Sequence, residues 1–206
     1  MSTRSTVAFE RESGKIVTSY VHYDGYVTGV GLTLLDEFNS EESARKIANH
    51  GDFSSLSSEN LSEKSRSSAS LFNSVSALSN WLEEKTESGG SVHDLEFAYL
   101  WKNGEWYVAD LGGEYTNSAE AKRLRASGNN DDMMAYYDGF YKSARWETLD
   151  TAFVRAAAEN IESLRKRMEK MDSETASDFE EHIEYLEEKR ESIRNKTIRE
   201  LASEIV

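Results

Sequence analysis

Alternating apolar and polar residues predict two β-hairpins in the first half of the chain. One covers residues 6–23 with a two-residue turn that ends at Gly14, and the other covers residues 95–110 with a turn that ends at Gly104. Glycine supplies the positive φ that tight hairpin turns require, and Asn103-Gly104 between strand formers is a strong hairpin signal. We therefore expect an α+β fold whose small antiparallel sheet consists of these two hairpins, packed with helices.

Each two-residue turn also predicts a strand register. In the first hairpin, one face then carries Val7, Phe9, Ile16, Tyr20 and His22. In the second hairpin, Lys102 lies opposite Glu105, which favours the pairing because the charges are opposite. One face of the second hairpin carries Phe97, Tyr99, Trp101, Trp106 and Val108. We expect helices to cover this aromatic face; an exposed platform for a ligand is the alternative.

Helical spacing and capping residues predict helices between the two hairpins. The first is a short helix over residues 32–38, and a second one is capped by Ser40 and runs to about Asn49. Residues 54–67 are rich in serine and are interpreted as a loop. Leucine and valine then recur at helical spacing, which predicts an amphipathic helix over residues 68–85.

The pattern is helical from residue 117 to the end. Short helices are expected over residues 117–125 and from residue 131. Apolar side chains then recur every three or four residues along two long segments, 146–171 and 173–205. Because a short polar turn joins these segments, they predict an antiparallel helical hairpin.

The second apolar stripe is interrupted at Arg190 and Thr197, so the hairpin is not an ideal coiled coil. The expected organisation is an α+β domain over residues 1–116, followed by a helical region over residues 117–206. The long helical hairpin occupies about residues 146–205 of that region, and oligomerisation through it is one possibility.

Composition and charge narrow the class of partner. The chain has 206 residues, a formal net charge of -14 and a pI of about 4.8. Such a charge disfavours direct binding to nucleic acid or to an anionic membrane, because phosphate recognition needs clustered Lys and Arg. It attracts a protein with a basic surface. The lack of cysteine, of a leader segment and of a membrane-spanning apolar run is consistent with a cytoplasmic protein.

Residues 18–31 are the densest group of candidate functional side chains. Ring-bearing residues surround an Asp-Gly turn there, and Tyr23, Asp24 and Tyr26 are the candidates for binding a partner. His22 and Asp24 would suit a general base oriented by a carboxylate, or half of a metal site. However, Asp-Gly is also what a turn requires, and the other histidines show no metal-ligand spacing.

Seven residues are expected to belong to structural motifs of the fold: His22, Gly25, Gly31, Gly51, Asp52, Asn103 and Gly104. No nucleotide-binding loop, nucleophile elbow or zinc pattern occurs in the sequence. We therefore expect neither an enzyme, nor a cofactor, nor a bound metal.

A ridge of carboxylates is predicted on the last helix, at Glu180, Glu184, Glu187 and Glu191. Mimicry of a nucleic-acid backbone toward a DNA-binding enzyme is the functional interpretation of this ridge. A solvated helix face is the structural one, and nearby Lys189, Arg190 and Arg194 dilute the negative charge.

Four segments together carry a family resemblance: residues 4–7, 22–26, 51–56 and 99–106. They contain an Arg-Ser strand, a His-Tyr-Asp-Gly-Tyr element, a Gly-Asp-Phe-Ser-Ser-Leu turn and a Trp-Lys-Asn-Gly-Glu-Trp hairpin. This combination resembles a family of uncharacterised proteins common in tailed bacteriophages, many of which have Trp where this chain has Tyr23. The helical hairpin lies outside the shared pattern, and the resemblance implies no catalytic residue.

The resemblance implies an accessory phage protein that acts in the cytoplasm of the infected host. Together with the charge, it predicts a protein that binds and inhibits a host enzyme or antiphage defence factor, of the toxin or nuclease type that handles nucleic acid. Two alternatives remain open: a small-molecule-binding or hydrolytic domain with a pocket at His22, Asp24 and Tyr26, and an oligomeric assembly protein that uses its helical arm.

Overall fold

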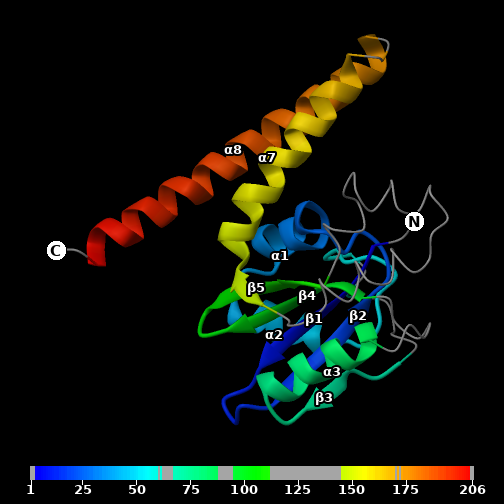
Figure 1. Ribbon diagram of the computed structural model, residues 1–206, viewed down its shortest axis with the longest axis vertical. Coiled ribbons are helices and arrows are strands. Elements are labelled where there is room, and N and C mark those ends of the chain that lie inside the picture. Colours follow the sequence, from blue (N-terminus) through cyan, green and yellow to red (C-terminus); the bar gives the residue numbers. More distant parts are fainter. Residues whose placement is uncertain are drawn as a thin grey trace. The chain divides into compact units, whose positions relative to one another are not determined.

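The computed structural model describes residues 3–59, 61, 67–87, 95–111, 145–169, 171 and 173–204. The chain divides into two compact units, Met1–Thr148 and Leu149–Val206. The boundary that we expected near residue 116, and the short helices expected between residues 117 and 144, lie outside the described residues. Figure 1 shows the sheet in the first unit and the long helices in the second.

The first unit is built on a six-stranded mixed sheet (Figure 1). Its strands are β1 (Arg4–Glu10), β2 (Ile16–Val21), β3 (Ser70–Phe72), β4 (Leu95–Lys102), β5 (Glu105–Asp110) and β6 (Trp146–Thr148). Their order across the sheet is β3-β2-β1-β4-β5-β6. β1 and β4 are parallel, whereas every other neighbouring pair is antiparallel. The α+β class is confirmed, but the expectation of a purely antiparallel sheet made of two hairpins alone was wrong.

The parallel pair arises because a helix carries the chain across the sheet. The chain runs from the edge strand β3 into α3 (Val75–Glu87), and then enters β4 on the far side of β1. Parallel strands need such a crossover, since a tight turn can only reverse the chain. The helix predicted over residues 68–85 therefore begins later than expected, after β3, where the Ser74 hydroxyl accepts a hydrogen bond from the Ala77 amide.

The register of the first hairpin differs from the prediction by one residue. Phe9 lies opposite Val17, and Arg11 pairs with Lys15 around a three-residue loop in which Gly14 has a φ of 76°. A three-residue hairpin loop ends with a residue in the left-handed conformation, which here is Gly14. Such a loop shifts the strand pairing by one residue relative to a two-residue turn. Ile16 and Tyr20 consequently lie on the opposite face from Phe9, because a slip of one residue exchanges the faces of a strand.

The second hairpin has the predicted register. Lys102 lies opposite Glu105, and Asn103 and Gly104 both have positive φ, at 52° and 87°. All five side chains of its aromatic face are buried, at 5% exposure or less, which excludes the exposed platform and leaves a covered sheet face.

Helices cover both faces of the sheet. On one face, α3 contributes Leu78 and Leu82 to a core that also contains Ala8, Ala98 and Leu100. On the other face lie η1 (Val27–Gly31), α1 (Leu32–Glu37) and α2 (Glu41–Ala48). Two side chains of the sheet are hydrogen-bonded to this layer: the Ser19 hydroxyl donates to the carbonyls of Ile47 and Ala48 at the end of α2, and the Trp106 indole donates to Phe38 O.

The two helices expected between residues 32 and 49 are confirmed. Ser40 caps α2, and its hydroxyl and that of Ser43 satisfy each other's backbone amides. The π-helical turn η1 that precedes α1 was not predicted. At the other end of the unit, residues 146–148 form β6 instead of the start of a helix, because they pair with β5.

The second unit is a helical hairpin of α7 (Leu149–Met168) and α8 (Ser173–Glu204). The predicted apolar stripes are buried at Phe153, Ala157 and Ile161 in α7, and at Ile183, Leu186 and Ile193 in α8. The Arg190 guanidinium, which interrupts the stripe, donates to Val154 O across the hairpin at 3.1 Å. The interrupting arginine is thus a polar link between the two helices.

Candidate functional site

The predicted cluster of candidate residues directly follows the end of β2 at Val21. Hydrogen bonds to two neighbouring segments hold its backbone. Beyond β2, the amide of His22 donates to Phe53 O at 3.0 Å, and the amide of Tyr23 donates to Ser54 O at 2.9 Å. These bonds continue the strand direction for two residues past the sheet. The backbone from which the Tyr23 side chain extends is therefore fixed by hydrogen bonds.

The chain then reverses at Asp24 and Gly25. Asp24 has a φ of 58°, in the left-handed region that Asp and Asn tolerate better than other side chains, and its carbonyl accepts from Val30 N at 2.8 Å. Gly25 lies against the start of β1: its amide donates to Thr3 O at 2.9 Å, and its carbonyl accepts from the buried Tyr99 hydroxyl at 2.8 Å. The turn is consequently anchored to two strands.

Two glycines are required here by close approach. A Cβ on Gly25 would lie 2.8 Å from the backbone carbon of Arg4, and a Cβ on Gly29 would meet the backbone oxygen of Asp24 and the ring of Tyr26. No real Cβ makes such short contacts without a shift of its neighbours. The dense packing of this backbone explains why glycine occurs at both positions.

Three side chains of this turn reach solvent, and we name them the Tyr-Asp-Tyr corner: Tyr23, Asp24 and Tyr26. Tyr23 is 48% exposed and Tyr26 is 40% exposed, and both are among the few large hydrophobic side chains of the described residues that lie so open. Burial of part of its ring, followed by the charge of Asp24 and a hydrogen bond to that carboxylate, raises the pKa of Tyr26 above its ordinary value. The corner thus presents two aromatic rings beside a negative charge.

His22 is not joined to Asp24. Its Nδ1 lies 3.0 Å from the hydroxyl of Tyr20, and its ring meets the Tyr23 ring edge-on with centroids 4.4 Å apart. The Asp24 carboxylate is instead the partner of Tyr26. Among the described contacts, the arrangement of a base oriented by a carboxylate is therefore absent, and His22 supports the Tyr23 ring by packing.

Three other predicted structural positions, Gly31, Gly51 and Asp52, lie in segments that flank the same end of β2, whereas Asn103 and Gly104 form the turn between β4 and β5. Gly31 is buried in η1, and Gly51 has a φ of 106° while its amide donates to the Ser19 hydroxyl at 2.9 Å. Asp52 is exposed just before Phe53, which pairs with Val21. These residues hold the segment that flanks the Tyr-Asp-Tyr corner.

The predicted carboxylate ridge is exposed along α8 at Glu180, Glu184, Glu187 and Glu191. Two members have basic neighbours: Glu187 accepts from Arg165 at 2.7 Å, and Glu191 lies 3.9 Å from Arg194. Arginines thus offset part of the charge, and the ridge is a less uniform acidic surface than the sequence spacing indicated.

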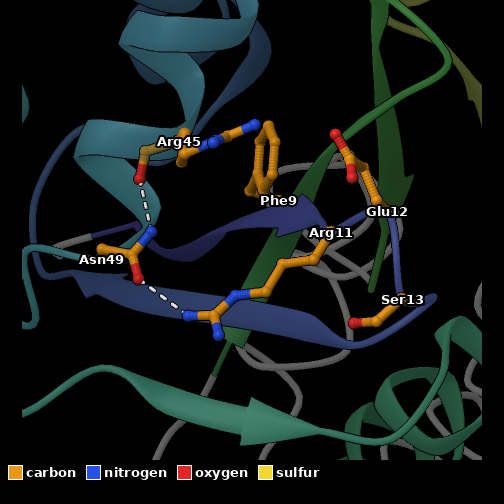
Figure 2. Close-up of a pocket in the computed structure, with 6 residues that line it drawn as sticks. All are labelled: Phe9, Arg11, Glu12, Ser13, Arg45 and Asn49. Atoms are coloured by element: carbon orange, nitrogen blue, oxygen red, sulfur yellow. Dashed lines mark hydrogen bonds between the residues drawn. The ribbon is translucent and has the colours of Figure 1, made fainter.

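One surface feature was not predicted from the sequence. We name it the arginine depression; it has a volume of about 460 Å³ and is lined by Phe9, Arg11, Glu12, Ser13, Arg45 and Asn49. Figure 2 shows these side chains around the depression, on β1, on the first hairpin turn and at α2 and its C-terminal end. Because they come from two segments separated in the sequence, residues 9–13 and 45–49, no local motif signals the depression.

Comparison of the sequence and the structure with protein-family models, curated proteins and solved structures finds no match. Among the described residues, no group of three His, Asp or Glu side chains is placed to hold a metal ion. No helix within the described part of the chain is long and apolar enough to cross a membrane.

Proposed function

We propose that this chain is a phage accessory protein that binds and inhibits a host enzyme or antiphage defence factor. The observation that carries the proposal is the Tyr-Asp-Tyr corner, in which Tyr23 and Tyr26 are 48% and 40% exposed on a backbone that is hydrogen-bonded on both sides. Tyrosine is enriched among the residues that dominate binding energy, because it offers a large surface and loses little side-chain entropy.

The charge of the chain supports a basic partner. A net charge of -14 accelerates encounter with a positively charged protein surface and repels nucleic acid and other acidic proteins. Proteins that handle nucleic acid carry such surfaces in their binding clefts. The resemblance to phage proteins is the reason for placing this partner in the infected host.

The corner is preferred to the carboxylate ridge as the main contact surface. Glu187 and Glu191 already have arginine neighbours, and exposed ion pairs of this kind contribute little to binding. Asp24 lies between two exposed rings, where a partner would bury apolar area and pair with a charge at the same place.

Affinity capture from infected cells tests the proposal. The corner variant combines Tyr23→Ser with Asp24→Asn, since Asn retains the left-handed backbone conformation. The matched control combines Tyr185→Ser with Glu188→Gln on α8, where both side chains are exposed and lie outside the carboxylate ridge, and therefore makes the same kinds of chemical change elsewhere. We expect a host protein to be retained in stoichiometric amount by the wild type and by the control, to be lost with the corner variant, and to elute at raised salt. Equal retention by all three proteins would argue against the corner.

A second candidate, assembly through the helical hairpin, has one observation in its favour. Ile198 is 53% exposed near the end of α8, where a large apolar side chain gains stability from a covering partner. Light scattering on the wild type and on Ile198→Glu would decide it: assembly predicts that the wild type is an oligomer and the variant a monomer.

A further inference from the structure

The arginine depression lies at the opposite end of β1 from the Tyr-Asp-Tyr corner. Phe9 is near the end of β1 and Arg11 follows it, whereas Gly25 of the turn contacts Thr3 and Arg4 at the start of that strand. A ligand in the depression would thus occupy a site separate from the proposed protein contact. The chemistry of its lining residues differs as well, since it gathers cations in an acidic chain.

Arg11 is held in place by a neutral group. One of its terminal nitrogens donates to Asn49 Oδ1 at 2.9 Å, and the Asn49 amide nitrogen in turn donates to Arg45 O at 2.7 Å (Figure 2). No carboxylate of the described residues lies within ion-pair distance of Arg11. The guanidinium is therefore oriented without losing its charge, and further donors remain available for an anion.

Arg45 supplies a second cation on the neighbouring wall. Its guanidinium lies over the Phe9 ring at 5.2 Å from the centroid, and it forms an ion pair with Glu41 at 2.5 Å. The ring contact and the ion pair fix the direction of the side chain. Since Glu41 offsets much of its charge, Arg45 acts here as an ordered hydrogen-bond donor rather than as the main attraction for an anion.

The remaining residues on the rim carry no positive charge. Glu12 and Ser13, on the turn between β1 and β2, are exposed and line the depression with a carboxylate and a hydroxyl. These groups accept hydrogen bonds from the hydroxyl groups of a ligand, whereas the carboxylate repels an anion. The depression is consequently bipolar, with a cationic end at Arg11 and an accepting end at Glu12.

We propose that the arginine depression binds a sugar phosphate. The phosphate would accept hydrogen bonds from Arg11, and the sugar hydroxyl groups would bond with Arg45, Glu12 and Ser13. Arginine suits phosphate because its planar group presents parallel donors. A volume of about 460 Å³ is within the range of small-molecule sites.

Titration of the isotope-labelled full chain, followed by amide NMR shifts, tests this assignment. Three probes are compared: glucose 6-phosphate, inorganic phosphate and glucose. We expect glucose 6-phosphate to cause saturable shifts in residues 9–13 and 45–49, and to bind at least about tenfold more tightly than either fragment, since both ends of the site contribute only with this probe.

Variants assign the binding to Arg11. Arg11→Gln removes the charge, and Asn49→Asp leaves Arg11 in place but pairs it with a carboxylate that repels phosphate. Both should weaken binding of glucose 6-phosphate at least about tenfold. Lys15→Gln is the matched control, because Lys15 is exposed beside the same turn and does not line the depression, and its affinity should stay within about twofold of the wild type.

Several results would overturn the proposal. Absence of saturable shifts with glucose 6-phosphate would do so, and so would binding of inorganic phosphate with equal affinity, which would show that the sugar makes no contact. An equal loss of affinity in Lys15→Gln would mean that only the general charge of this end of the protein attracts the anion. Spectra of each variant in the absence of ligand show whether it is folded, so that loss of binding is not confused with unfolding.

Discussion

Replacing Gly25 with alanine tests whether the Tyr-Asp-Tyr corner depends on close contact with β1. The added Cβ would lie 2.8 Å from Arg4 C, 2.9 Å from Thr3 O and 2.9 Å from Ser5 Cβ, whereas ordinary contacts begin at 3.4 Å. Arg4 C and Thr3 O are backbone atoms at the start of β1, so no side-chain rotation can move them away from the added Cβ. The turn must therefore move outward by about half an ångström or more.

The cost of this movement can be estimated from the contacts. Overpacking of a tight site costs about 1–3 kcal/mol. The hydrogen bonds of Gly25 with Thr3 and with the buried Tyr99 hydroxyl weaken together, and a single hydrogen bond contributes about 1 kcal/mol. We expect a total loss of about 2–4 kcal/mol, which corresponds to a fall in Tm of about 5–15 °C for a unit of this size.

Thermal unfolding followed by circular dichroism measures this loss, and Gly14→Ala is the matched control. Gly14 has a φ of 76° with nothing within 4 Å of an added Cβ, so alanine there meets backbone strain alone, about 1 kcal/mol. Gly25 has no positive φ, so its cost is steric. A Gly25→Ala protein with the Tm of the wild type would refute the close contact on which the rigid corner rests.

Further outcomes follow from three other contacts. Burial and then the Asp24 carboxylate raise the pKa of Tyr26, so its stabilising contribution is complete below about pH 10 and is lost as the pH rises through the folded-state pKa. The difference in absorbance titration between the wild type and Tyr26→Phe should show this late ionisation, and Asp24→Asn should shift it to lower pH. Trp106→Phe leaves the buried Phe38 carbonyl without its donor and should lower the free energy of unfolding in urea by about 1–3 kcal/mol. Arg190→Met should leave the helical content measured by circular dichroism unchanged and should change the free energy of unfolding by less than about 1.5 kcal/mol, because methionine restores the apolar stripe. A loss of helical content would contradict this expectation.

Local signals predicted the parts of the fold that local chemistry determines. Asn103 and Gly104 fixed the second hairpin, and the apolar spacing of residues 149–164 identified α7. The first hairpin shows the limit of such signals, because a glycine such as Gly14 can end either a two-residue or a three-residue loop. Only the packing of both faces decides between them, and it selects the longer loop.

Pairings between distant segments could not be predicted in this way. β1 pairs with β4 across about 90 residues, and the sequence of each strand is compatible with either strand direction. β3 and β6 have three residues each, which is too short for a period of two to be visible, and both were predicted as helix. These strands form because an open sheet edge is available to them.

The candidate sites also differ in whether neighbouring residues in the sequence are enough to predict them. Tyr23, Asp24 and Tyr26 are neighbours in sequence beside a turn, so their exposure together could be predicted. The position of His22 depended on the hairpin register and was wrong, since it lies beyond β2 against Tyr20 rather than on the face of Phe9. The arginine depression joins two segments separated in the sequence and becomes visible only in the folded chain.

Hydrogen exchange on the complex recovered by affinity capture is the most direct test of the proposed binding function. We predict that binding of the partner slows amide exchange in residues 22–31, beyond the protection that the free protein already has from its backbone hydrogen bonds. Residues 180–191 of α8 should change little by comparison. Protection confined to α8, with no change at residues 22–31, would contradict the account that the Tyr-Asp-Tyr corner is the surface that binds the partner.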